Sequence, residues 1–421
     1  MSIVSGSQVY NIIDRVMGIM NSDILDHGQI VSYIFYKMLQ TNGCYSNKDL
    51  AEYAMIGLLH DIGIMKTGYR ISLATAENSN IWGHSIYGYL FLKYLSPADD
   101  KAEIVLYHHL DYNKHKYIKS DYIDEAACLS LADKMDMFMR ESKVTAMDRD
   151  YFQKNINITF SDTALKLFNR AQEKYNITSK LASGEYKQEL ENLFDDAHFS
   201  DEYIRRYLQM IVYSIDFRSQ QTVLHALGTT TFAECIGKIM GIRGRQLEEL
   251  YYGALLHDIG KIAIPLNILE APRRLTDEEM RIMKAHVLIT ERILDGVVDK
   301  RIFEIAIRHH EKVDGTGYPR GLSGEELGLQ ERVMAVADIL SALYGKRSYK
   351  DSMPKEKILA IISEDGKSGK LCNKVASKVI ERYDSILQYY DSHMTGTQSI
   401  YMLILEQYDK IYEKFKRFEK M

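Results

Sequence analysis

The histidines of this 421-residue chain fall into two series with the same order and similar spacing. Each series has a single His, a His-Asp pair, another His, a His-His pair and a final Asp. The first series comprises His27, His60, Asp61, His84, His108, His109 and Asp133. The second series comprises His225, His257, Asp258, His286, His309, His310 and Asp338. Ten of the 13 histidines belong to these series, which argues strongly against a chance arrangement.

Imidazole and carboxylate groups are common ligands of divalent metals. Seven candidate ligands in each series are more than one ion needs, so two ions per series are expected. An Asp that directly follows a His can bridge two ions with its two oxygens. Two metals about 3.5–4 Å apart activate water at neutral pH and stabilise in-line attack on phosphorus. A purely structural metal would usually have four ligands in a closed site, so the pattern favours phosphohydrolase chemistry.

The sequence around the histidines repeats as well. GLLHDIGI at 57–64 corresponds to ALLHDIGK at 254–261. A period of roughly 200 residues indicates two duplicated domains and not a solenoid. We therefore expect a first domain over 1–140, a helical connector over 141–214, and a second domain with a C-terminal helical extension over 215–421.

Helical periodicity dominates the segments that must position these side chains. Between 221 and 240, apolar residues recur every three to five positions, as on one face of a helix. Segments 47–60, 300–311 and 331–345 show the same pattern. Prolines number only five in the whole chain, and signals for strands and turns are sparse. The sequence therefore predicts a mostly helical protein.

Composition excludes several other classes of protein. The 53 basic and 58 acidic residues give a net charge of −5, which argues against a general binder of DNA or of anionic membranes. The four cysteines are scattered without CxxC spacing, so neither a disulfide framework nor a cysteine zinc site is expected. No stretch approaches the roughly 18 apolar residues of a membrane-spanning helix. We expect a cytoplasmic protein.

The order of ligands resembles the HD-domain superfamily of metal-dependent phosphohydrolases. In the second copy, HDIGKIAIP at 257–265 and HHEKVDGTGYPRGL at 309–322 resemble the HD-GYP subgroup, as does KRSYK at 346–350. The resemblance implies an all-α fold of two tandem HD-type helical bundles. It also implies hydrolysis of a cyclic dinucleotide, c-di-GMP or 3′3′-cGAMP, to the linear dinucleotide.

The same resemblance implies roles for the residues of the second copy. One ion would be held by His225, His257, Asp258 and Asp338. The other would share Asp258 and bind His286, His309 and His310. Lys261 would neutralise charge that builds on the phosphate, while Asp314, Tyr318 and Arg320 of the GYP loop would contact substrate. The resemblance favours Fe or Mn, although Ni, Co and Zn also suit such donors.

Two positions of the second copy depart from the family pattern. Some members carry a Glu four residues before the first His and bind a third ion, but Gln221 stands there in this chain. We therefore expect a dinuclear site. An Asp often follows three residues after the last ligand, and Ser341 takes its place. That change affects a contact to a ligand and not the ligand set itself.

The first copy keeps every core ligand and adds Asp23 and Asp136 at the two flanking positions. However, Ile64 stands where the second copy has Lys261, and segment 108–122 lacks a GYP loop. It therefore resembles only the general HD superfamily. One interpretation is a second, nucleotidase-type active site that removes phosphate from the linear product. The other is a relic that holds metal and regulates or packs against its twin.

Two further hypotheses concern the whole chain. The protein could be a signalling module that binds a cyclic dinucleotide without turnover, but the intact ligand set and Lys261 argue against this. It could be a general nucleotide phosphohydrolase, but the GYP loop argues against that. We also expect the two HD copies to pair within one chain, which gives a monomer or, with a further contact, a homodimer.

Overall fold

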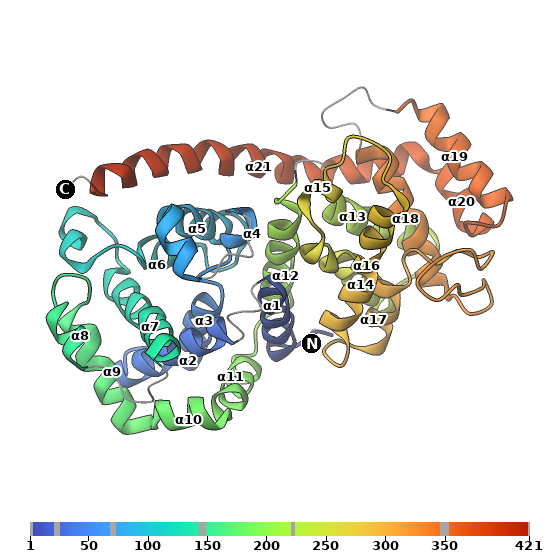
Figure 1. Cartoon of the computed structure of the whole chain (residues 1–421). Helices are drawn as coiled ribbons and strands as arrows, with labels where there is room; N and C mark the ends of the chain where they lie inside the picture. The colour runs from blue at the N-terminus through green and yellow to red at the C-terminus, as the bar shows by residue number, and fades with distance from the viewer. Residues whose placement is uncertain are drawn as a thin grey trace. The chain divides into compact units, whose positions relative to one another are not determined.

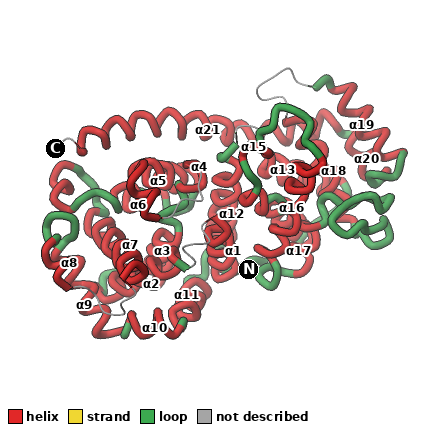
Figure 2. Tube along the Cα trace, viewed as in Figure 1, coloured by secondary structure: helices red, strands yellow, loops and turns green. Residues whose placement is uncertain are grey.

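The computed structural model describes residues 3–20, 26–67, 73–142, 149–219, 224–345 and 353–419. Within these ranges every regular element is a helix and no strand occurs, which confirms the predicted all-α fold (Figure 2). The helices expected from the four periodic segments are α3 (Asn47–Leu58), α13 (His225–Ile239), α17 (Lys300–Ile307) and α18 (Leu329–Gly345). No described helix is long and apolar enough to cross a membrane.

The chain divides into two compact units. The N-terminal unit comprises Val4–Met210 together with Leu403–Met421. Its further helices are α1 (Gly6–Met20), α2 (His27–Asn42), α4 (Ile64–Thr67), α5 (Leu73–Leu95), η2 (Asp99–Lys101), α6 (Glu103–Tyr107), η3 (Tyr112–Tyr117), α7 (Ile123–Ser142), α8 (Arg149–Lys154), α9 (Asp162–Tyr175), α10 (Ile177–Ser183) and α11 (Glu185–Asp196) (Figure 1).

The C-terminal unit comprises Ile211–Met402. Its further helices are α14 (Arg245–Leu256), η4 (Ile259–Ala263), α15 (Leu266–Leu269), α16 (Asp277–Leu294), α19 (Lys355–Lys367) and α20 (Asn373–Glu381). Two helices, α12 (Asp201–Asp216) and α21 (Tyr383–Glu419), each run from one unit into the other.

These units divide the chain differently from the domain limits expected from the sequence. Residues 149–210, expected to form a connector, belong to the N-terminal unit and bury Phe168 and Phe194 there. The end of α21, expected to extend the second domain, also belongs to the N-terminal unit. Its Phe415 packs against Trp82, with ring centroids 4.7 Å apart. Burial of these aromatic side chains is the physical reason why the flanking helices join the first unit.

Each unit is built around the helix that begins at the first histidine of its series. In the N-terminal unit α2 packs along α3, α7 and α9. In the C-terminal unit α13 packs along α14 and α18 over a buried apolar cluster, in which Phe232 stacks on Tyr390 at 4.4 Å. This arrangement positions several candidate ligands, because α2 and α13 start at His27 and His225 while α7 and α18 carry the final Asp of each series.

The HDIG motif needs its glycine in both units because another helix crosses it closely. A Cβ atom on Gly63 would lie 1.9 Å from the carbonyl oxygen of His84. A Cβ atom on Gly260 would lie 2.1 Å from the carbonyl oxygen of His286. Such distances exclude any side chain. The two glycines therefore let the helix bearing the third histidine approach the His-Asp pair.

Candidate metal centres

In the C-terminal unit the Asp258 carboxylate lies between two groups of histidines. Its Oδ2 atom lies 3.4 Å from His225 Nε2 and 3.0 Å from His257 Nε2. Its Oδ1 atom lies 3.4 Å from His286 Nε2 and 3.9 Å from His309 Nε2. Ligand atoms bound about 2.0–2.3 Å from a common ion have such mutual separations, so one carboxylate faces two potential ion positions.

The other two predicted residues complete this cluster. Asp338 Oδ1 lies 3.1 Å from His225 Nε2, and Asp338 Oδ2 lies 3.5 Å from His310 Nδ1. His310 also groups with His286 and His309 closely enough to share an ion. All seven residues predicted for the second series are therefore brought together.

Backbone contacts orient the rings of this cluster. The Nδ1 atoms of His257, His286 and His309 each lie 2.6 Å from the carbonyl oxygen three residues earlier. Each Nδ1–H can donate there, which leaves Nε2 as the lone pair that points into the cluster. His257 Nε2 and Asp258 Oδ1 are buried without a hydrogen-bond partner. Such groups are costly unless something pairs with them, and a divalent ion would do so.

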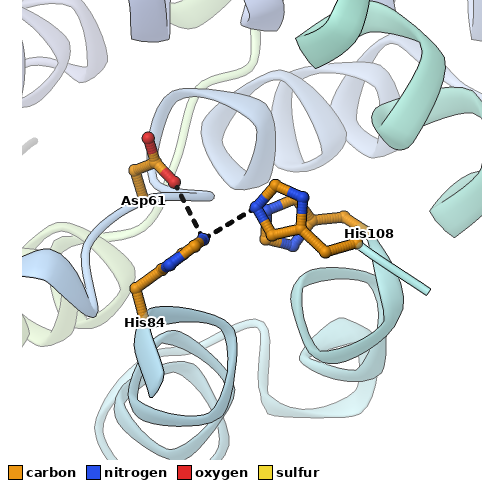
Figure 3. A group of neighbouring side chains, drawn as sticks. Asp61, His84 and His108 are labelled. Carbon is orange, nitrogen blue, oxygen red and sulfur yellow. Dashed lines mark hydrogen bonds and ion pairs between the residues drawn. The ribbon is translucent and has the colours of Figure 1, made fainter. Parts of the chain in front are cut away.

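The N-terminal unit repeats this geometry around Asp61. Asp61 Oδ2 lies 3.5 Å from His60 Nε2 and 3.8 Å from His27 Nε2, whereas Oδ1 lies 3.5 Å from His84 Nε2. Figure 3 shows the side chains of Asp61, His84 and His108 pointing toward one another. His109 Nε2 lies 2.8 Å from His84 Nε2.

The other histidines of the first series are oriented in the same way, and several of their Nε2 atoms have no hydrogen-bond partner. Asp133 Oδ1 lies 3.3 Å from His27 Nε2. The Nδ1 atoms of His60 and His108 lie 2.8 and 2.6 Å from backbone carbonyls. The Nε2 atoms of His27, His60 and His108 are buried without a hydrogen-bond partner. The seven residues predicted for the first series are thus also brought together.

The electrostatics of both clusters suit cations. Burial lowers the pKa of His108 to about 3 and that of His286 to about 4, so both imidazoles are neutral at pH 7. Burial opposes ionisation of Asp133 and Asp338, but contacting histidines hold the pKa of each carboxyl well below its usual range. Neutral imidazoles and ionised carboxylates are the protonation states that bind metal.

One histidine in each cluster lies where positive charge is strongly favoured. Burial opposes protonation of His27 and His257, yet the neighbouring carboxylates raise the pKa of each to about 10. The carboxylates in contact are Asp133 and Asp136 for His27, and Asp258 and Asp338 for His257. A metal ion at either place would compete with a proton.

The two clusters differ in what supports the first histidine. Asp136 Oδ2 lies 2.7 Å from His27 Nδ1, whereas the hydroxyl of Ser341 lies 3.2 Å from His225 Nδ1. Ser341 thus contacts His225 at the position where Asp136 contacts the equivalent His27 in the first copy. Asp23, Gln221 and segment 346–350, which the sequence singled out, lie outside the described residues.

The two clusters also differ in a lysine that contacts the central aspartate of the second copy. Lys261 Nζ contacts Asp258 Oδ2 in the C-terminal unit. Burial would lower the pKa of Lys261, but the charge of Asp258 and then that of Asp216 raise it. The ammonium group is therefore charged beside the cluster, while the first copy has Ile64 at the same place.

Two residues that the sequence did not single out, one at the end of α12 and one just after it, hold this region. Asp216 Oδ2 accepts a hydrogen bond from the backbone N–H of Ala226, at 3.1 Å. Arg218 donates to the backbone carbonyl of Lys261 at 3.3 Å and to that of Ile264 at 3.4 Å. They precede the first histidine and belong to no motif, so only their contacts across the fold identify them.

The GYP loop places its predicted substrate residues in different surroundings. The Tyr318 ring lies 4.7 Å from the His310 ring, so it borders the cluster. Arg320 is exposed and pairs with Glu291 at 2.7 Å. Asp314 is exposed and accepts hydrogen bonds from Thr316 within its own turn.

A buried carboxylate that the sequence analysis overlooked anchors this loop. Glu311 is 2% exposed. Its two oxygens accept the backbone N–H groups of Arg320 and Leu322, at 2.8 and 2.9 Å. The first copy has the apolar Leu110 at the corresponding position. The signal was present in the sequence as HHE against HHL, but the partners of Glu311 lie nine and eleven residues away.

Comparisons with known proteins identify an HD domain in each half of the chain. Two family models, both described as HD domain, match residues 24–137 and 205–373. A 3′3′-cGAMP-specific phosphodiesterase of Vibrio cholerae is 26% identical over 91% of this chain and 92% of that protein. A cyclic di-GMP phosphodiesterase response regulator of Xanthomonas campestris is 36% identical over 38% of this chain and 43% of that protein.

A solved structure supports the fold of the whole chain. The crystal structure of a cyclic GMP-AMP-specific phosphodiesterase of V. cholerae has a TM-score of 0.55 with this chain. It is 20% identical in sequence, and the match covers 91% of this chain and 98% of that one. At this identity the likeness concerns the fold.

Proposed function

The chain belongs to the HD-domain family of metal-dependent phosphohydrolases, with one HD domain in each half, and from this we propose that its C-terminal site hydrolyses a cyclic dinucleotide. The observation that carries the proposal is the Asp258 carboxylate, which faces two histidine groups while Lys261 contacts it. Relatives named as phosphodiesterases for 3′3′-cGAMP and cyclic di-GMP support the substrate class. They do not favour a binding module without turnover.

The proposed metal content is two divalent ions per C-terminal site, with Fe or Mn favoured. His225, His257, Asp258 and Asp338 would hold one ion, and Asp258, His286, His309 and His310 would hold the other. Ions bound there would supply an activated water and neutralise charge on the phosphate. These are the seven residues whose lone pairs converge.

Other residues of the chain would bind and orient the substrate around those ions. The Lys261 ammonium would stabilise negative charge on the phosphate oxygens while water attacks phosphorus and the ester P–O bond breaks. Tyr318 would present its ring beside His310 and so border the bound nucleotide. Glu311 would keep the loop in place through two backbone hydrogen bonds. The product would be the linear dinucleotide.

Product analysis tests this proposal. Mn²⁺- or Fe²⁺-loaded protein would be offered 3′3′-cGAMP, c-di-GMP and linear pGpG, and the products would be separated by chromatography. We expect conversion of at least one cyclic dinucleotide to its linear form. Absence of turnover of any cyclic dinucleotide, with two metals per C-terminal site demonstrably bound, would overturn the proposal.

A second candidate function concerns the N-terminal site, because its donor set is complete. An adjoining cavity is lined by Met17, Leu58 and Ile64 together with His27 and Asp61. We propose that this site removes the terminal phosphate from the linear product. Phosphate release from pGpG would be measured for the wild type and for a His60→Ala/Asp61→Ala variant. Equal release by both proteins would contradict this second activity.

A further inference from the structure

A cyclic dinucleotide brings two phosphate groups to the enzyme, and the site described above accounts for one of them. Each phosphodiester carries a full negative charge, and the two belong to one small ring. Cleavage requires one phosphate to lie at the histidine clusters beside Lys261. The second phosphate then lies elsewhere over the same surface and needs its own partner.

Near this surface lies a cation, Lys284, that has no acidic partner among the residues that the structure describes. Lys284 lies on α16 two residues before His286. Its side chain is exposed, and it forms no ion pair with any carboxylate among the residues that the structure describes. Arg320, by contrast, is occupied by Glu291 at 2.7 Å. An unpaired ammonium is the more available group for a substrate phosphate.

The position of Lys284 connects it to the site. Its Nζ atom lies 4.8 Å from the centroid of the Tyr318 ring. The Tyr318 ring in turn lies 4.7 Å from that of His310, and its backbone N–H donates to the carbonyl oxygen of His310 at 3.2 Å. A cation–π contact of this kind holds the ammonium near the tyrosine. Lys284 is therefore placed beside the GYP loop, one ring away from a proposed metal ligand.

The first copy lacks this arrangement. Trp82 stands two residues before His84, where the second copy has Lys284. Trp82 is 7% exposed and packs against Phe415. Ile64 also replaces Lys261, so the first copy lacks both of these lysines, and the cation beside its cluster is instead Lys134, 3.9 Å from Asp133 Oδ2. The pair of lysines is thus specific to the copy proposed to cleave the cyclic substrate.

We propose that Lys284 binds the second phosphate of the cyclic dinucleotide, the one that is not cleaved. This role rests on the function proposed above for the C-terminal site. Lys284 is a substrate-binding residue, so its removal weakens binding more than it slows cleavage. It also gives the site a preference for ligands with two phosphates over simple phosphodiesters.

The test compares Lys284→Gln with the wild type and with Lys374→Gln. Lys374 is an exposed lysine of α20 for which no ion pair occurs among the described residues, so it matches the charge change. Affinity would be measured by calorimetry with a non-hydrolysable phosphorothioate analogue of 3′3′-cGAMP. Cleavage would be measured with 3′3′-cGAMP and with bis(p-nitrophenyl) phosphate, which has a single phosphate.

We expect Lys284→Gln to lower affinity for the cyclic analogue roughly tenfold, as loss of one charged hydrogen bond should. The KM for 3′3′-cGAMP should rise similarly with kcat within about twofold, and cleavage of bis(p-nitrophenyl) phosphate should not change. The binding of the analogue should also become less sensitive to salt. Lys284→Arg should restore most of the affinity.

Affinity equal to that of Lys374→Gln would overturn the role of Lys284. An equal loss with bis(p-nitrophenyl) phosphate would overturn it as well, because the lysine would then support the metal site in general. If the wild type bound the analogue but cleaved no cyclic dinucleotide, the proposed activity would fail while the binding measurement still decided the role of Lys284. Absence of binding by the wild type, together with no cleavage of any cyclic dinucleotide, would reject both.

Discussion

The two halves of this chain carry the same set of seven candidate ligands, but the residues around that set differ. Both place an Asp between two histidine groups with buried, unpaired nitrogen atoms. Only the C-terminal half adds Lys261, Lys284 and the GYP loop held by Glu311. We therefore expect the candidate ligands to determine metal binding, and the neighbouring charges and loops to determine which phosphate compound is accepted.

The largest effect expected from this difference concerns Lys261. Lys261→Met should lower kcat for cyclic dinucleotide cleavage by about 10²–10³-fold, because a charge aimed at the developing phosphate charge is lost. Steady-state kinetics of the metal-loaded protein would measure it. Ile64→Met is the matched change in the first copy and should leave this activity unchanged. Similar kcat values for the two variants would show that Lys261 does not distinguish the C-terminal site from the N-terminal one.

The support of the first histidine is the next point of comparison. Asp136→Ala removes the carboxylate that lies 2.7 Å from His27 Nδ1. Loss of such a contact typically weakens metal affinity about 10–100-fold. Competition with a chelator would measure this loss at the N-terminal site. Ser341→Ala should have a smaller effect at the C-terminal site, since a neutral hydroxyl at 3.2 Å polarises the ring less. The reverse order would show that the aspartate does not strengthen the first site.

Glu311 provides a third contrast, because the first copy has Leu110 there. Glu311→Gln replaces one accepting oxygen by an NH₂ group that faces a backbone N–H. A buried unsatisfied group costs about 1–3 kcal/mol, so we expect a looser GYP loop and a KM about tenfold higher. Leu110→Ala in the first copy is the control and should leave KM for the cyclic substrate unchanged. An unaltered KM in Glu311→Gln, with the variant folded, would show that the loop does not contact substrate.

The smallest expected effect is a pH dependence shared by both copies. In metal-free protein the carboxylates around His27 and His257 raise the pKa of each ring from 6.5 to about 10, against the effect of burial. The folded state then holds more protons than the unfolded state between these values, so its stability falls as pH rises. Thermal unfolding should show a melting temperature about a few degrees lower at pH 9 than at pH 7.

Metal should reverse this trend, because it binds the neutral rings and releases their protons. Calorimetric titration with metal in buffers of different ionisation enthalpy would count those protons. His257→Gln should retain only the part that His27 contributes. A metal-free melting temperature that rises between pH 7 and pH 9 would contradict the assignment of these two rings.

Much of the fold and of the two candidate sites could be predicted from the sequence, because short motifs place several candidate ligands within one turn of each other. The His-Asp and His-His pairs and their repetition identified all fourteen residues that the structure groups. Helical periodicity also predicted α3, α13, α17 and α18. These signals are local, and local signals are strong in the linear sequence.

The features that escaped prediction depend on contacts between distant residues. Lys284 lies near the site because it contacts the ring of Tyr318, and Arg218 because it donates to the backbone carbonyl of Lys261. Neither pair of residues is close in sequence. The end of α21 was expected to extend the second domain, but its Phe415 packs against Trp82 of the N-terminal unit. An apolar stripe specifies burial and leaves its partner open.

Reciprocal inactivation of the two halves shows which of them cleaves the cyclic substrate. Cyclic dinucleotide cleavage and bound metal would be measured on His257→Ala/Asp258→Ala and His60→Ala/Asp61→Ala variants, with folding checked by circular dichroism. We predict that each variant loses metal from its own site. Cleavage should fall about 10³-fold or more only in the first variant, and the second should stay within about threefold of the wild type. Equal loss of cleavage in both variants, or retained cleavage in His257→Ala/Asp258→Ala, would contradict the assignment of this reaction to the C-terminal half.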